Sequence, residues 1–102
     1  MSGGAVTVFA SFRPHPGRED ELRELLSWMV RNSRTEAGCE RYDLYRAQGE
    51  AGTFHLFERY RDRDALEAHR AAPYYVEYRR RVADMLEGTV EVVLLDPIDV
   101  VP

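Results

Sequence analysis

Apolar residues recur along the chain with two different spacings, one typical of β-strands and one typical of α-helices. Four segments rich in valine, phenylalanine and tyrosine show the strand pattern: Ala5–Arg13, Cys39–Ala47, Thr53–Arg61 and Thr89–Leu95. Three segments carry an apolar residue at every third or fourth position, as helices do: Arg18 to about Glu36, Asp62–Ala71, and a run that Pro73 opens and Gly88 ends. The predicted order is β-α-β-β-α-β, with the second helical part in two pieces.

The residues at the ends of these segments are of types that favour turns and helix starts, which supports the predicted boundaries. Pro14–Gly17 ends the first strand, because proline lacks a backbone donor and glycine favours a turn. Three acidic residues, Glu19–Glu21, lie in the first turn of the first helix, where they complement the helix dipole. The segment Gln48–Gly52 has turn composition, so the two middle strands are expected to pair as an antiparallel hairpin.

This order predicts an α+β fold of the split β-α-β type, with one antiparallel sheet and helices on one of its faces. A chain of 102 residues has room for one hydrophobic core, so a single domain over residues 1–102 is expected. Its core would span about residues 5–95, and residues 96–102 would form a C-terminal tail.

The sheet is expected to have apolar residues on both faces, although helices cover only one. In the first strand, for example, Val8 and Ala10 share one face while Ala5 and Phe9 share the other. The uncovered face would be a large exposed apolar patch in a monomer. A homodimer stacked sheet to sheet would bury it, with the apolar tail Ile98–Val101 available to cross onto the partner. The alternative is a monomer with irregular alternation.

Composition and charge exclude several classes of partner. The net charge is −4 and the pI about 5.3, which argues against nucleic acid or an anionic membrane as partner. The single cysteine, Cys39, cannot form an internal disulfide or a cysteine-based zinc cluster. The chain has neither a signal-like start nor a run of roughly 20 apolar residues, so a cytoplasmic location is expected.

Several short motifs, taken in chain order, resemble those of a known family. They are Pro16–Asp20 at the start of the first helix, Glu36–Cys39 after it, Tyr42, then Phe57–Tyr60, and Ala68–Arg70 before Pro73. Together they make the chain similar to the antibiotic biosynthesis monooxygenase domain over about residues 5–95. The resemblance implies a dimeric ferredoxin-like α+β barrel and cofactor-independent oxygenation of aromatic substrates. Relatives of this family also isomerise or break down other small molecules.

The sequence departs from the family pattern at one position and from its haem-degrading relatives at another. The family commonly has tryptophan at the end of the third strand, where this chain has Tyr60. Haem-degrading relatives use a histidine of the last helix as iron ligand, whereas residues 75–79 here read Tyr-Val-Glu-Tyr-Arg. No haem role, and no other metal or cofactor, is therefore expected.

Oxygenation without metal or flavin requires a general base that converts the substrate to an electron-rich anion in a dry pocket. Histidine suits this role because its ordinary pKa, about 6.5, lies near neutral pH. His69 is the first candidate, because it shares the inward face of a short helix with Leu66 and matches the family position. The alternative is a core histidine whose ring is hydrogen-bonded by a backbone carbonyl or by Glu58.

Glu58 is the second catalytic candidate. It lies on an otherwise apolar strand face, where an unpartnered carboxylate is costly to bury. It could orient His69 and raise its basicity, or it could pair with an arginine such as Arg41 or Arg59. His55 is expected on the opposite face of the same strand, outside this site.

Four aromatic residues are candidates for the walls of a substrate pocket: Trp28, Tyr60, Tyr75 and Tyr78. Flat rings could sandwich an aromatic substrate, and the tyrosines could donate hydrogen bonds to a quinone oxygen. The alternative is ordinary core packing, since aromatic residues at helical spacing usually serve that purpose. Arg79 could bind an anionic substrate group or be an exposed helix residue.

The sequence thus favours a homodimeric, cofactor-independent monooxygenase that acts on a small aromatic phenol or quinol, or a polyketide-type compound, with O2. Its partners would be that aromatic molecule, O2 and a second copy of the chain. Two alternatives stay open: an isomerase or cyclase on the same scaffold, and a non-catalytic dimer that binds a ligand.

Overall fold

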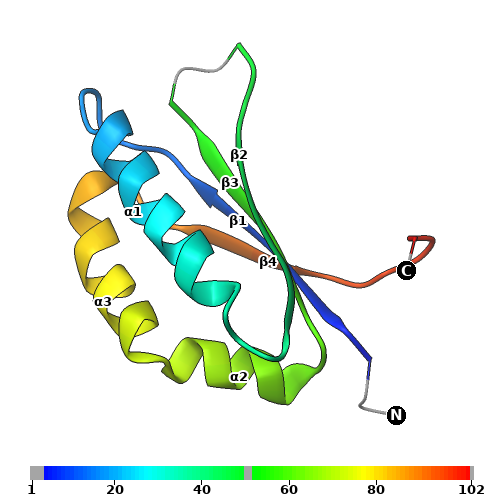
Figure 1. Cartoon of the computed structure of the whole chain (residues 1–102). Helices are drawn as coiled ribbons and strands as arrows, with labels where there is room; N and C mark the ends of the chain where they lie inside the picture. The colour runs from blue at the N-terminus through cyan, green and yellow to red at the C-terminus, as the bar shows by residue number, and fades with distance from the viewer. Residues whose placement is uncertain (1–3, 50–51, 102) are drawn as a thin grey trace.

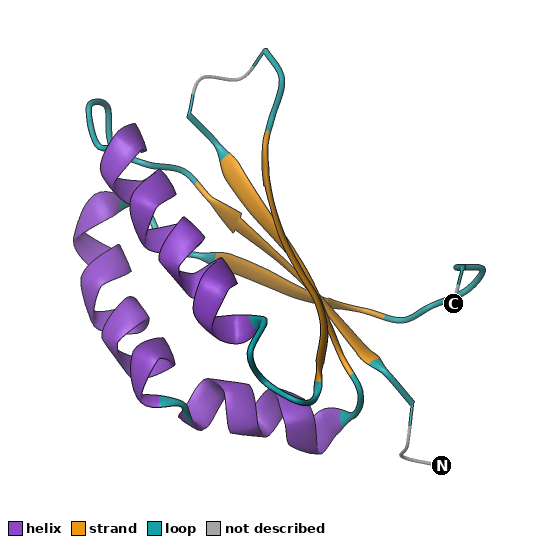
Figure 2. Ribbon diagram, in the orientation of Figure 1, coloured by secondary structure: helices purple, strands orange, loops and turns teal. Residues whose placement is uncertain are grey.

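Four antiparallel strands form one sheet, and all the helices of the described chain lie against one side of it (Figures 1 and 2). The computed structural model describes residues 4–49 and 52–101. Its elements are β1 (Val6–Phe12), α1 (Glu19–Ser33), β2 (Cys39–Arg46), β3 (Phe54–Tyr60), α2 (Arg63–Ala71), α3 (Pro73–Val82), the 3₁₀ turn η1 (Ala83–Met85) and β4 (Glu91–Leu95). The predicted α+β, ferredoxin-like fold is confirmed.

The strand order in the sheet is β2-β3-β1-β4, so β1 and β3 are central and β4 is an edge. Strands β2 and β3 pair as the predicted antiparallel hairpin, with Tyr42 opposite Glu58. The register of β1 and β3 places Phe12 opposite Phe54 and Val6 opposite Tyr60. Two residues of the predicted turn Gln48–Gly52, at positions 50–51, lie outside the described residues.

Two helices end earlier than the apolar pattern predicts. Helix α1 ends at Ser33. The backbone hydrogen bonds that follow span three residues instead of four, as when Glu36 N donates to Ser33 O at 3.1 Å. Helix α3, which begins at Pro73, ends at Val82, and the chain continues as the 3₁₀ turn η1. There Met85 O accepts from His15 N at 2.8 Å, which ties the chain to the loop after β1.

The core lies between the helices and the inner face of the sheet. Along β3 the residues at positions 54, 56, 58 and 60 are buried, whereas those at 55, 57 and 59 are only half-buried. Glu58 therefore faces the helices and His55 faces the opposite side, as predicted. Helix α1 contributes Leu22, Leu25, Leu26 and Met29 to the opposing apolar surface.

The outer face of the sheet and the edge strand carry exposed apolar residues. Every residue of β4 is exposed, including Val93 at 50% and Leu95 at 41%. Ile98 in the tail is 98% exposed. On the outer face the ring of Phe9 stacks against His55, with centroids 5.5 Å apart. No helix covers this surface in the described chain, as Figure 2 shows.

A close approach between the α1–β2 turn and α2 makes Gly38 sensitive to substitution. A Cβ atom at this position would lie 2.4 Å from Ala65 Cβ, far inside van der Waals contact. We expect Gly38→Ala to lower the free energy of unfolding by about 1–3 kcal/mol, as overpacking typically does. Urea unfolding measures the change, with Gly4→Ala as control because no atom lies within 4 Å there. Equal midpoints for the two variants would contradict the predicted clash.

Candidate active site

The side chain of His69 points from α2 into the core and is 2% exposed. Helix α2 begins after Asp62, whose carboxylate accepts a hydrogen bond from Ala65 N at 2.8 Å. This cap fixes where the helix begins. Leu66 and His69, three residues apart, therefore both face the sheet. The inward orientation predicted for His69 is confirmed.

One nitrogen of the His69 ring is held by a carboxylate from the α1–β2 turn. His69 Nδ1 lies 2.9 Å from Glu36 Oε2 and 3.2 Å from Oε1. An ionised carboxylate only accepts hydrogen bonds, so Nδ1 carries the proton and Nε2 is left with a lone pair directed away from Glu36. Tyr74 also donates its hydroxyl to Glu36, which fixes the carboxylate from a second side.

Three tyrosine rings surround the imidazole of His69. The ring centroids of Tyr42, Tyr60 and Tyr75 lie 5.5, 5.2 and 5.1 Å from its own. These rings come from β2, β3 and α3, so the imidazole is enclosed by three different elements. The enclosure excludes bulk water and keeps the side chain in one orientation.

Glu58 lies on β3, 6% exposed, and accepts a hydrogen bond from the Tyr60 hydroxyl at 2.6 Å. The structure thus places Glu36, rather than Glu58, on the His69 ring, which differs from the expected pairing. The arginines considered as partners of Glu58 bind elsewhere: Arg59 lies 2.9 Å from Glu40, and Arg41 lies 2.8 Å from Asp43.

Burial shifts the pKa values of both candidates in directions that leave them uncharged. It raises the pKa of Glu58 from 4.5 to about 7, and Tyr60 offsets only part of this effect. It also lowers the pKa of His69 below 6.5, although the bond to Glu36 works in the opposite direction. Near neutral pH the imidazole is therefore neutral, and Glu58 carries its proton in a substantial part of the molecules.

Two adjoining cavities lie beside these groups. The inner one, about 30 Å³, is lined by His69 and Glu58 among others. The outer one, about 420 Å³, lies between α3 and β4 and is lined in part by Arg79. Tyr75 and Tyr78 line both cavities, so they stand between the outer cleft and the inner space. Of the four aromatic residues predicted as pocket walls, Tyr75 and Tyr78 thus line both cavities.

Of the other two, Tyr60 lies against His69, but Trp28 lies away from it. Trp28 packs edge-on against Tyr74, with centroids 6.4 Å apart, and the guanidinium of Arg81 lies 5.7 Å from its ring. It lines neither of the two cavities. Its place between α1 and α3 indicates a structural role.

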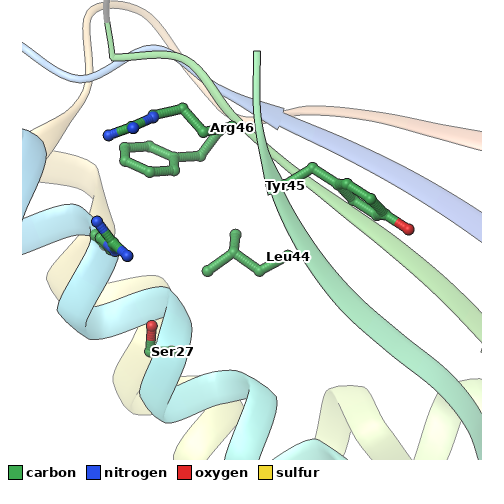
Figure 3. Close-up of a pocket in the computed structure, with 6 residues that line it drawn as sticks. Ser27, Leu44, Tyr45 and Arg46 are labelled. Carbon is green, nitrogen blue, oxygen red and sulfur yellow. The ribbon is translucent and has the colours of Figure 1, made fainter. Parts of the chain in front are cut away.

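A further cavity, about 230 Å³, lies between α1 and the β2–β3 hairpin. Its lining residues are Arg23, Ser27, Leu44, Tyr45, Arg46 and Phe54. Figure 3 shows Leu44 directed toward Ser27, whereas Tyr45 points to the other side of its strand. Among the described residues that line this space there is no histidine and no carboxylate, so they supply no general base.

Two residues of the site were not among the sequence candidates, Glu36 and Tyr42. Glu36 had a detectable signal: it follows the carboxyl end of α1, where a negative charge is unfavourable for the helix dipole. An acidic residue in that place suggests a partner elsewhere in the fold. Tyr42 lies in a strand, and nothing in the sequence indicates that its side chain meets His69.

Within residues 4–49 and 52–101, no group of three or more metal-ligating side chains is placed to hold a metal ion. The same residues include no helix with the length and apolar character needed to cross a membrane.

Comparisons with known proteins agree with one another. The family model described as "Antibiotic biosynthesis monooxygenase" matches residues 5–81. The Mycobacterium tuberculosis protein named "Putative monooxygenase Rv0793" is 45% identical over 94 residues, 92% of either chain. Its solved structure superposes with a TM-score of 0.92, covering 97% of this chain and 100% of that one.

Two more distant proteins are also similar to this chain, one in its solved structure and one in its sequence. The structure of PA3566 from Pseudomonas aeruginosa has a TM-score of 0.88 at 28% identity and covers 97% of this chain and 99% of its own. "Putative monooxygenase YcnE" of Bacillus subtilis is 25% identical over 88 residues, 86% of this chain and 93% of that protein. These names support a monooxygenase-type function. The chain belongs to the antibiotic biosynthesis monooxygenase family.

Proposed function

We propose that the protein is a cofactor-independent monooxygenase that oxidises a small aromatic phenol or quinol, or a polyketide-type compound, with O2. The observation that carries this proposal is the buried His69, whose Nδ1 is bound by Glu36 while Nε2 keeps its lone pair for a substrate proton. A carboxylate–histidine pair in a water-poor site is a general base suited to neutral pH.

The chemistry begins when His69 Nε2 takes the hydroxyl proton of the substrate. The resulting phenolate is electron-rich and transfers electrons to O2, so the substrate itself is the reductant. The aromatic enclosure of His69 excludes water that would otherwise stabilise the anion and slow this step. Tyrosine hydroxyls help to hold the oxygen atoms, because burial raises the pKa of Tyr78 and keeps it a donor.

The sizes of the two cavities suggest where the substrate binds. The inner space of about 30 Å³ holds little more than one water molecule. The outer cleft of about 420 Å³ lies in the range of small-molecule sites. The ring system therefore occupies the cleft between α3 and β4, and its hydroxyl reaches His69 past Tyr75 and Tyr78.

Oxygen uptake tests the proposal directly. Purified protein is incubated with 1-naphthol, 1,4-naphthalenediol and anthrone, and O2 consumption and products are followed against protein-free controls. We expect one equivalent of O2 per molecule of product and no reaction under argon. Conversion that proceeds equally well without O2 would contradict the oxygenase and identify an isomerase or cyclase.

The same proposal includes a homodimer formed through the outer face of the sheet. On this face Phe9 lies next to Phe57 on β3 and Val93 on β4, its register partners. Such a continuous apolar row is unfavourable in water. Pairing two copies face to face would cover it, and the exposed tail could extend onto the second copy.

A charge on this face should prevent association. We expect Phe9→Glu to convert the dimer to a folded monomer, because a carboxylate would be buried without a partner. Sedimentation velocity measures the mass. Val76→Glu is the matched control, since Val76 is 60% exposed on α3 in the helical layer. A wild-type chain that sediments as a monomer would contradict the proposed dimer.

A further inference from the structure

The proposed base uses His69 and the half-buried Glu36, which leaves the buried acid Glu58 without a function. Glu58 is 6% exposed, on a strand face that is otherwise apolar or aromatic. Among the described residues it has no arginine partner within salt-bridge distance, since Arg41 and Arg59 bind other acids. An unpaired carboxylate in such a place is strongly disfavoured, whereas a neutral carboxylic acid is tolerated.

The position of Glu58 relative to His69 is the second observation. Both side chains line the inner cavity of about 30 Å³, Glu58 from the sheet and His69 from α2. Tyr60 donates to Glu58 Oε1, which leaves Oε2 as the place for a proton. The other titratable or charged groups around Glu58 are Cys39 and Tyr42 on β2, Arg70 on α2, Tyr75 and Tyr78 on α3, and Glu36 after α1.

We propose that Glu58 is a further catalytic residue, which holds a proton in the resting enzyme and delivers it to the reduced oxygen while His69 holds the proton taken from the substrate. This role rests on the proposed oxygenase function and deepens it. The site then contains a base and an acid on two walls of one cavity. One group can take a proton from the substrate while the other gives a proton to the reduced oxygen, without a water molecule from bulk solvent.

The proton and electron balance can be written for a phenol with an unsubstituted para carbon, such as 1-naphthol. His69 takes the hydroxyl proton, and the naphtholate carbon forms a bond to O2, which is reduced to a peroxide anion. Glu58 protonates that anion to a hydroperoxide. The Glu58 carboxylate then removes the proton of the same carbon as the O–O bond breaks. The departing hydroxide takes the proton of His69, which yields quinone and water and restores both side chains.

The raised pKa of Glu58 agrees with this assignment. At a value of about 7 the carboxyl is mostly protonated at pH 6 and gives up its proton readily near neutrality. Tyr60 is unsuited to the same role, because burial and the neighbouring Glu58 raise its pKa above the ordinary value. Tyr60 instead holds the carboxyl in place through its hydroxyl.

The test compares wild type with Glu58→Gln, which keeps the shape and the acceptor for Tyr60 but cannot transfer a proton. With 1-naphthol or anthrone we expect quinone formation to fall about 100-fold. A carbon-bound peroxide anion that is not protonated in place should instead lose O2 and return to naphtholate, so O2 consumption should fall together with quinone formation. Glu77→Gln, on the exposed side of α3, should behave as wild type. Quinone formation by Glu58→Gln at the wild-type rate would overturn the proposal.

A measurement on the protein without substrate separates this proposal from the oxygenase itself. Carbon-13 NMR of glutamate-labelled protein reports each side-chain carboxyl, and Glu58→Gln assigns the Glu58 signal. We expect this signal to titrate near pH 7. A Glu58 carboxyl already ionised at pH 6 would overturn the proton-donor role alone. Absence of O2 uptake by wild type with every probe would instead overturn the proposed function.

Discussion

Replacing His69 with glutamine should lower the rate of oxygen-dependent turnover by about 10²–10⁴-fold, the usual contribution of a positioned acid–base group. Glutamine can still bond to Glu36 through its amide, so the α1–β2 turn keeps its contact with α2. It has no lone pair basic enough to take a phenol proton. Oxygen uptake with 1-naphthol or anthrone measures the loss, and circular dichroism checks that the fold is retained.

A matched substitution separates this effect from a general loss of histidine. His15 lies exposed in the loop after β1, and His15→Gln should have wild-type turnover. The pH profile gives a second check. His69 acts only when neutral, and burial lowers its pKa below 6.5, so the acidic limb of the wild-type pH profile should lie below that value. Turnover by His69→Gln at the wild-type rate would exclude His69 as the base.

The fold could be predicted from the sequence because its information is local. The alternation along β3 and the three- to four-residue spacing in α1 each depend on neighbours in the chain. Together with Pro14, Gly38 and Gly88 they define the order of elements. The inward orientation of His69 follows from its spacing to Leu66, and the outward orientation of His55 follows from its alternation with Glu58.

The partners within the site could not be predicted, because they depend on how distant segments meet. Glu36 and His69 are 33 residues apart and come together only through the packing of the α1–β2 turn beside α2. Glu58 and His69 both face the core, so the sequence suggested a direct pair between them. Trp28 was placed on the correct helix, but the edge of α1 on which it lies meets α3 rather than the cavity.

The pH dependence of stability should reveal Glu58 even without a substrate. Its pKa is 4.5 in the unfolded chain and about 7 in the folded protein. The folded state therefore binds this proton more tightly, and the associated stability is fully present below pH 4.5 and lost as the pH rises through 7. At about 1.4 kcal/mol per tenfold change in proton affinity, the loss is about 3 kcal/mol.

Glu58→Gln should remove this loss, because an amide does not ionise. We expect the free energy of unfolding of the variant to exceed that of wild type by about 3 kcal/mol at pH 8.5 relative to the difference at pH 4. Urea unfolding across this range measures it, with Glu77→Gln as control. The His69 contribution has the opposite sign, since its lowered pKa costs stability as the pH falls below 6.5. That contribution is present in both proteins and cancels in their difference. A difference independent of pH would mean that Glu58 is ionised in the fold, and it could then not serve as a proton donor.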